Sequence, residues 1–141
     1  VFDENAFAMG GLSGHAGLFG TLENCEQFGV WLLETWLGKR KDVLSTKTVR
    51  LFTKRAVNPK VGDWALGFVV PSRPVSTGGR LISNNAFGHT GFTGTSLWID
   101  PKRQAVVTIL SNRTYPTRND ERFKALRIEL HDIVWRSLDE K

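Results

Sequence analysis

The 141-residue sequence contains one cysteine, one methionine and one tyrosine, and these scarcities narrow the possible classes of protein. The single thiol of Cys25 cannot form an internal disulfide framework. Cys25 stands at helical spacing with apolar residues and has acidic neighbours, which favours a buried structural cysteine. No apolar run approaches the roughly 20 residues that a membrane-spanning helix needs, and no signal-peptide pattern opens the chain.

Several motifs of catalytic chemistry are also missing from the sequence. The phosphate-binding G-x-x-x-x-G-K, the dinucleotide-binding G-x-G-x-x-G and the G-x-S-x-G nucleophile elbow do not occur. The three histidines, His15, His89 and His131, share no helix face, and Cys25 lies beside none of them, so metal-ligand spacing is absent. We therefore expect no metal and no cofactor, and we expect His131 on the surface or flank of a helix.

The charge and length point to an ordinary globular piece of protein. The net charge is +5, from 19 lysines and arginines against 14 acidic residues. These basic residues are scattered and no nucleic-acid-binding motif accompanies them, so we expect no nucleic-acid partner. The length suits one domain. Because the first residue is Val1 and not methionine, we expect an excised or processed piece of a longer protein.

The hydrophobic periodicity predicts three helices. An irregular, glycine-rich segment over residues 8–21 precedes Thr21, a suitable N-cap for an amphipathic helix that ends near Gly38. Ser45 caps a second helix, which ends before Asn58-Pro59. A long helix begins near Asn119, and its expected apolar stripe consists of Phe123, Leu126, Leu130, Ile133 or Val134, and Leu138.

Apolar runs between the second and third helices predict strands. We expect strands over residues 64–70, 96–99 and 104–110, with a short one possible over 80–82. Residues 100–103 have the chemistry of a tight turn, because proline suits its second position. The run over 104–110 is apolar almost throughout, which indicates burial on both faces or pairing on both edges. The predicted fold class is α+β, an antiparallel meander flanked by helices.

The stretch "FGHTGFTGTSLW", residues 87–98, gathers three glycines and four hydroxyl residues around His89. Small residues let the backbone approach a ligand, and a strand end can offer peptide N–H groups to an oxyanion. A glycine-rich hairpin without a functional role explains the same spacing. From the residues alone, both interpretations stay open.

His89-Thr90-Gly91, followed by "FTGTSLWIDPKRQAVVTILSNRTYP", resembles the third active-site element of the serine β-lactamase and penicillin-binding-protein superfamily. That element is usually Lys-Thr-Gly, and His-Thr-Gly is typical of the esterase-like and class-C-like branches. The "GGLSGHAGLFGT" segment before a helix resembles another loop of this family, and the tail "LSNRTYP" resembles its last-strand segment. The resemblance covers nearly the whole chain. It implies an incomplete β-lactamase or transpeptidase-like fold and a parent in the cell envelope or periplasm.

The resemblance also implies roles for five residues. His89 would take the place of the family lysine on the floor of the cleft, and Thr90 would offer its hydroxyl to a substrate carboxylate or carbonyl. Gly91 would leave room for the ligand, the Phe92 N–H would be one of two oxyanion donors, and Asn112 would line the carboxylate end. Because a histidine titrates near neutrality, its contribution would depend on pH, which favours a neutral ester or another peptide-like acyl substrate over a β-lactam.

The family nucleophile, the serine of S-x-x-K, is missing. None of the eight serines has lysine three residues later, and the only match to a Ser-x-Asn spacing, Ser83-Asn84-Asn85, lies too close to the third element. We therefore expect residues 1–141 to be the C-terminal portion of one β-lactamase-like domain, inactive alone, that needs the missing N-terminal part as a partner.

Three functions follow as alternatives. The first is a serine hydrolase fragment whose parent cleaves an ester, amide or β-lactam. The second is a non-catalytic, penicillin-binding-protein-like domain that only binds peptide or cell-wall-like ligands, and the third is a basic nucleic-acid-binding module. We also expect self-association, because a strand over 104–110 without its far-side neighbour would expose a sheet edge.

Overall fold

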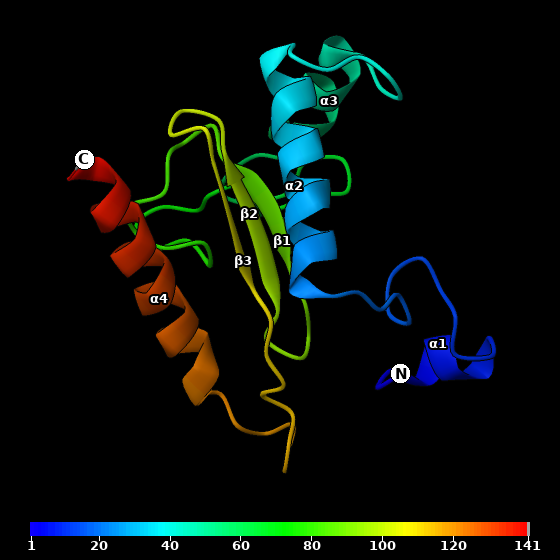
Figure 1. The fold of residues 1–141 in the computed structure, drawn as a ribbon. Coiled ribbons are helices and arrows are strands. Elements are labelled where there is room, and N and C mark those ends of the chain that lie inside the picture. The colour runs from blue at the N-terminus through cyan, green and yellow to red at the C-terminus, as the bar shows by residue number, and fades with distance from the viewer. Residues whose placement is uncertain (141) are drawn as a thin grey trace.

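The computed structural model describes residues 1–140. Four helices and three strands follow one another in the order α1, α2, α3, β1, β2, β3, α4 (Figure 1). Their bounds are α1 Glu4–Ala8, α2 Leu22–Leu37, α3 Thr46–Thr53, β1 Phe87–Thr90, β2 Ser96–Asp100, β3 Ala105–Ile109 and α4 Arg122–Asp139. The structure confirms the predicted α+β class with an antiparallel meander.

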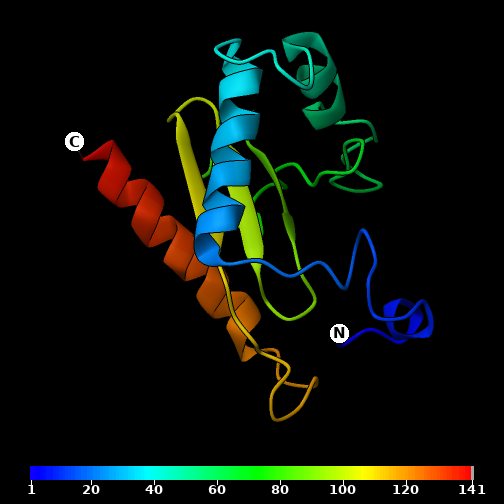
Figure 2. The same cartoon turned by 45° about the vertical axis from the view of Figure 1, so that its right-hand side comes forward.

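The three strands form one antiparallel sheet in the order β1-β2-β3. Helix α2 covers one face of this sheet, and α4 covers the other (Figures 1 and 2). Side chains alternate between the faces: Leu97 and Ile99 of β2 pack in the core on the α2 side, whereas Trp98 packs with Trp135 of α4. The fold therefore has three layers, with a separate hydrophobic core on each side of the sheet.

The caps that the sequence predicted define α2 and α3. The Thr21 side chain accepts a hydrogen bond from the Asn24 N–H, and Ser45 does the same for Thr48. Leu32 and Leu33 of α2 are buried as expected. The first half of α2 is less covered, so Cys25 is only half-buried instead of buried. Helix α1 was not predicted.

The prediction for the last helix was wrong in its orientation. Helix α4 begins at Arg122, three residues later than expected, and its predicted apolar stripe is largely exposed, with Ile133 60% accessible. The residues that face the sheet are Arg127, His131, Asp132 and Trp135. Polar groups on this face form hydrogen bonds with the loop and the strand opposite. Hydrogen bonding, as well as the apolar surface, therefore determines which face of α4 is buried.

Two predicted strands are not regular strands. Within residues 64–70, Gly67 has a positive φ of 83° and the Ala65 N–H donates to the Phe68 carbonyl, so the chain turns back on itself. Only Val69 of this segment pairs with β1, through both backbone groups of Gly88. Residues 80–82 are held by α4 instead of a strand, because Asp132 accepts hydrogen bonds from the N–H groups of Arg80 and Leu81.

Within residues 1–140 the strand over 104–110 is neither buried on both faces nor paired on both edges, and its far-side edge is exposed, as expected for this chain without a far-side neighbour. Strand β3 is shorter, pairs only with β2 within residues 1–140, and has one buried residue, Val107. The turn before it, in contrast, is confirmed: Asp100 accepts hydrogen bonds from the N–H groups of Lys102 and Arg103. Because β3 is an edge strand here, apolar side chains that a larger sheet would bury are only half-covered.

Candidate functional site

The His-Thr-Gly sequence lies at the end of β1, on the edge of the sheet that β2 does not occupy. His89 is paired across the sheet with Leu97, and Thr90 is paired with Ser96. Cross-strand partners share a face, so the His89 side chain leaves on the α2 side and Thr90 on the α4 side. His89 is exposed and Thr90 half-buried, which leaves the outer edge between them accessible.

The environment of His89 defines which of its ring nitrogens is free. The His89 Nδ1 atom lies 2.8 Å from the Thr90 carbonyl oxygen. Because a carbonyl only accepts, Nδ1 carries the proton in this hydrogen bond, and neutral His89 presents Nε2 as an acceptor. The ring of Trp64 lies beside it, with a centroid separation of 6.0 Å. The imidazole is thus oriented by one backbone atom and one aromatic ring.

Gly91 closes the tight turn after β1. Its N–H donates to the Thr95 carbonyl at 2.8 Å, and its carbonyl accepts from the Gly94 N–H at 3.0 Å. A Cβ at position 91 would meet the Thr95 hydroxyl, so a larger residue there would require the Thr95 side chain to move. The role that the resemblance implies for Gly91, room for a ligand, stays a prediction.

The backbone N–H of Phe92 follows directly. Within residues 1–140 it donates to no other group, whereas the N–H of Gly91 before it is bonded. The Phe92 side chain is 55% exposed. A peptide N–H without a partner can donate to a ligand oxygen and stabilise negative charge on it.

Asn112 is brought to the same end of the sheet. The segment after β3 returns to the turn, where the N–H of Arg113 and the hydroxyl of Ser111 both donate to the Thr93 carbonyl, at 2.9 and 3.0 Å. Asn112 is exposed between these two residues, and its Oδ1 accepts a hydrogen bond from the Thr114 hydroxyl. The five residues named by the sequence thus come from one strand, one turn and the segment that packs against that turn.

Two buried arginines lie behind this turn, and sequence reasoning missed both. Arg113 donates from Nε to the Phe92 carbonyl at 2.8 Å, and Arg127 of α4 approaches the Gly94 carbonyl from Nη1 at 3.4 Å. Burial, and to a smaller extent the charge of Arg113, lower the pKa of the Arg127 guanidinium. The turn therefore has positive charge on its inner side. The sequence shows only two arginines among polar and apolar neighbours, which does not indicate that their side chains are buried.

Ser83, the serine that matched the Ser-x-Asn spacing, has a structural role. Its hydroxyl accepts a hydrogen bond from Arg103, and its N–H donates to the buried carboxylate of Asp100. These contacts hold the segment before β1 to the β2–β3 turn. They explain the residue without a catalytic role.

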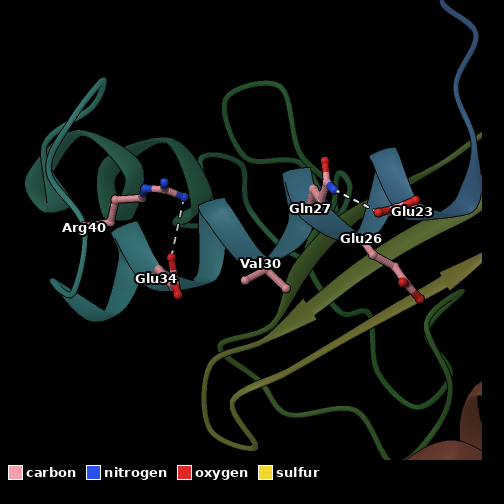
Figure 3. A pocket seen from close by; sticks show the side chains of 6 residues that line it. All are labelled: Glu23, Glu26, Gln27, Val30, Glu34 and Arg40. Carbon is pink, nitrogen blue, oxygen red and sulfur yellow. Dashed lines mark hydrogen bonds and ion pairs between the residues drawn. The ribbon is translucent and has the colours of Figure 1, made fainter.

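A shallow hollow lies elsewhere, on the outer side of α2. Figure 3 shows its lining side chains, three glutamates among them, with Arg40 beside Glu34 at 3.6 Å and Gln27 donating to Glu23. None of the candidate residues of β1 contributes to this hollow. Among residues 1–140, no cluster of three or more histidine, cysteine or acidic side chains is placed to hold a metal ion.

Comparisons with known proteins show that this chain is similar to the serine hydrolases that include β-lactamases and carboxypeptidases. The family model described as Beta-lactamase matches residues 2–131. The chain therefore belongs to the beta-lactamase family, as the His-Thr-Gly resemblance predicted.

Two curated relatives illustrate the similarity. A protein of Escherichia coli K12 named "putative D-alanyl-D-alanine carboxypeptidase" is 35% identical over 147 residues, which cover 96% of this chain and 32% of the relative. A protein of Salmonella gallinarum with the same name is 40% identical over 119 residues, covering 82% of this chain and 27% of the relative. The chain thus spans about a third of the length of the curated relatives it matches.

A solved structure supports the fold. A beta-lactamase from Mycobacterium bovis superposes with a TM-score of 0.66 at 23% identity, over 84% of this chain and 44% of that one. The sheet and its helices are accordingly an incomplete β-lactamase-like fold. No helix among residues 1–140 is long and apolar enough to cross a membrane.

Proposed function

We propose that residues 1–141 form the C-terminal portion of one β-lactamase-like domain and supply the charge-stabilising wall of an acyl-serine hydrolase. The observation that carries this proposal is the Phe92 N–H, which follows His89-Thr90-Gly91 at the end of β1 and has no partner within residues 1–140. The matched relatives are about three times longer, which leaves room in a parent protein for the serine nucleophile that this sequence lacks. The chain alone is then inactive.

The proposed roles are those that the family resemblance implies for these residues. The Phe92 N–H donates to the oxygen that becomes negative when the nucleophilic serine attacks a carbonyl carbon. The neutral His89 accepts a hydrogen bond at Nε2 from a hydroxyl of the nucleophile's network, because its Nδ1 proton is held by Thr90. The Thr90 hydroxyl and the Asn112 side chain contact the substrate at its carbonyl or carboxylate end. The substrate is an ester, amide or β-lactam.

A non-catalytic binding domain is the second candidate. It is favoured by the presence of the partner-free Phe92 N–H in a sequence that contains no S-x-x-K serine. In that case the edge of β1 binds a peptide or cell-wall-like carbonyl without acylation. The name carboxypeptidase belongs to the relatives, and a peptide ending in D-alanine is a reasonable first ligand for either candidate.

The test needs a longer polypeptide in which an upstream region carrying S-x-x-K and Tyr-x-Asn precedes residue 1. A chromogenic ester and a chromogenic β-lactam are assayed side by side on this protein and on residues 1–141 alone. We expect turnover of the ester by the longer protein only. Replacement of His89 by alanine should lower kcat/KM about 100-fold, because general acid–base groups contribute roughly 10²–10⁴-fold.

His15→Ala is the matched control, because His15 is exposed and its ring forms a hydrogen bond with Ser13 in the irregular segment before α2. It should turn over the ester at the parental rate. Equal rates for the parental protein and His89→Ala would remove His89 from the site. Tight binding of a substrate peptide without any acyl-enzyme in mass spectrometry would favour the binding domain.

A further inference from the structure

Arg113 holds the turn that presents the Phe92 N–H. Its side chain is only 6% exposed although it carries a full charge. Its Nε donates to the Phe92 carbonyl at 2.8 Å, and its Nη1 donates to the carbonyls of Arg118 and Asp120 at 3.1 and 3.0 Å. One guanidinium thus joins the turn after β1 to the loop that leads into α4.

Phe92 is consequently fixed on both sides of its N–H. On one side, the Gly91 N–H is bonded to the Thr95 carbonyl; on the other, the Phe92 carbonyl is bonded to Arg113. The Arg113 guanidinium also lies 4.9 Å from the centroid of the Phe92 ring, within the range of a cation–π contact. Both the backbone and the side chain of Phe92 therefore contact the same buried cation.

The stack continues to the beginning of the chain. The ring of Phe2 lies 6.4 Å from that of Phe92 with an interplanar angle of 17°, and the Arg118 guanidinium lies 4.7 Å from the Phe2 ring. Arg118 in turn pairs with Glu4 at 3.3 Å. The Phe92 ring therefore has two neighbours: Arg113, which follows it in the sequence, and Phe2 in the segment before α2.

We propose that Arg113 is a positioning residue: it fixes the direction of the Phe92 N–H so that this group points at the developing oxyanion. The inference rests on the proposed function, in which that N–H is an oxyanion donor. The planar fork of arginine suits the task, because it serves three carbonyls at once, which the single ammonium of lysine cannot do. Arg113 also pairs with Glu121 at 3.7 Å, so the proposed role is the direction it gives to Phe92 and not an unpaired charge behind the turn.

A purely structural role is the competing explanation. In that case Arg113 only joins β3, the turn and the loop before α4. Its loss then lowers the stability of the fold and the amount of active protein, and leaves kcat of the folded protein unchanged. Positioning makes a different prediction. Misdirection of one oxyanion donor lowers kcat while the substrate still binds, since that interaction is made mainly in the transition state.

The experiment uses the longer, active protein described above with Arg113→Gln and Arg113→Lys. We expect Arg113→Gln to lower kcat for the ester about 10- to 100-fold, below the roughly 10²–10³-fold cost of removing an oxyanion donor, with KM within about threefold. Arg113→Lys keeps the cation and one hydrogen bond, so it should recover part of kcat. Arg136→Gln is the matched control, because that side chain is exposed on α4 and takes no part in the hydrogen bonds of Arg113.

A second readout does not depend on activity. In residues 1–141 labelled with ¹⁵N, Arg113→Gln should shift the Phe92 amide signal and lower its order parameter, whereas Arg136→Gln should leave both unchanged. Should Arg113→Gln fail to fold, the lysine variant decides both measurements.

Unchanged kcat in Arg113→Gln, or a kcat and KM that change by equal factors, would overturn the positioning role while the proposed function stands. An unperturbed Phe92 amide would overturn it as well. A longer protein that lacks turnover with Arg113 intact would overturn the proposed function, and the positioning role with it.

Discussion

The imidazole Nε2 of His131 lies 3.1 Å from the hydroxyl of Ser96, and this buried hydrogen bond joins α4 to β2. The His131 ring is fully buried and stacks on that of Trp135 at 6.1 Å. Within residues 1–140 its Nδ1 has no hydrogen-bond partner. A charged imidazolium at this position would bury a cation with a donor unsatisfied, so the fold requires the neutral ring.

The stability of the chain should therefore depend on pH through His131. Burial, together with the nearby charge of Arg127, lowers the pKa of His131 to about 4 from its usual 6.5. Between these two values the unfolded chain binds a proton that the folded chain does not, so stability rises with pH across this window and falls as pH drops. A shift of this size corresponds to about 3 kcal/mol.

Urea unfolding between pH 4 and 7 measures this effect. His131→Gln keeps a side chain that can bond to Ser96 but cannot titrate, so its unfolding free energy should vary less over the window. His15→Gln removes an exposed histidine and should follow the parental curve. Identical slopes in all three proteins would show that His131 does not carry the pH dependence.

A second prediction concerns the pair of Asp100 and Arg103 at the β2–β3 turn. The Asp100 carboxylate is fully buried and lies 2.7 Å from Arg103, which also reaches Asp139 at the end of α4. Hydrogen bonds to Asp139 and Asp100 raise the pKa of the guanidinium. Replacement of Arg103 by methionine leaves a buried carboxylate without its counter-ion and should lower the unfolding free energy by about 3 kcal/mol.

The matched variants separate charge from packing. Arg122→Met, on an exposed surface, should leave the unfolding midpoint in urea unchanged. Asp100→Asn in the Arg103→Met background removes the buried charge and should recover part of the lost stability. If the double variant is as unstable as the sum of the two single variants, the pair is not coupled and the explanation fails.

Local signals in the sequence predicted the elements that local chemistry determines. Thr21 and Ser45 fix the starts of α2 and α3, and the proline after Asp100 fixes the turn between β2 and β3. Each of these depends on contacts within three or four residues, which a linear pattern contains. The antiparallel order of the strands followed because short turns join neighbours.

Features that depend on distant partners could not be predicted. His131 appeared to be off the apolar stripe of α4, yet it is buried because Ser96, 35 residues earlier, accepts or donates its hydrogen bond. The residues over 64–70 had the composition of a strand, but only Val69 finds a partner strand. Hydrophobic periodicity depends only on the spacing of apolar residues, so it cannot indicate which polar groups will form contacts across the core.

The candidate site was predicted through family resemblance, and its supporting residues were not. His89, Thr90, Gly91, Phe92 and Asn112 do come to one end of the sheet. Their roles stay predictions. Arg113, which touches Phe92 from 21 residues away, carries no local signal of its position, because a buried arginine is recognised only by the carbonyls around it.

The last prediction concerns the outer edge of β3. Within residues 1–140 this strand pairs only with β2, and Leu110 at its end is 44% exposed. An unpaired edge with apolar side chains invites pairing with another copy of the chain. We expect residues 1–141 to associate with increasing concentration, and Leu110→Lys to weaken that association about tenfold, since a charge at an edge disfavours pairing.

Sedimentation equilibrium over a hundredfold range of concentration measures the association. Leu12→Lys is the matched control, because Leu12 is 81% exposed in the irregular segment before α2, away from the sheet. It should associate as the parental chain does. Equal weakening by both variants would indicate general apolar contact instead of edge pairing. A chain that stays monomeric at the highest concentration would show that β3 is protected by its own twist or by α4, and the upstream region would not be needed to cover it.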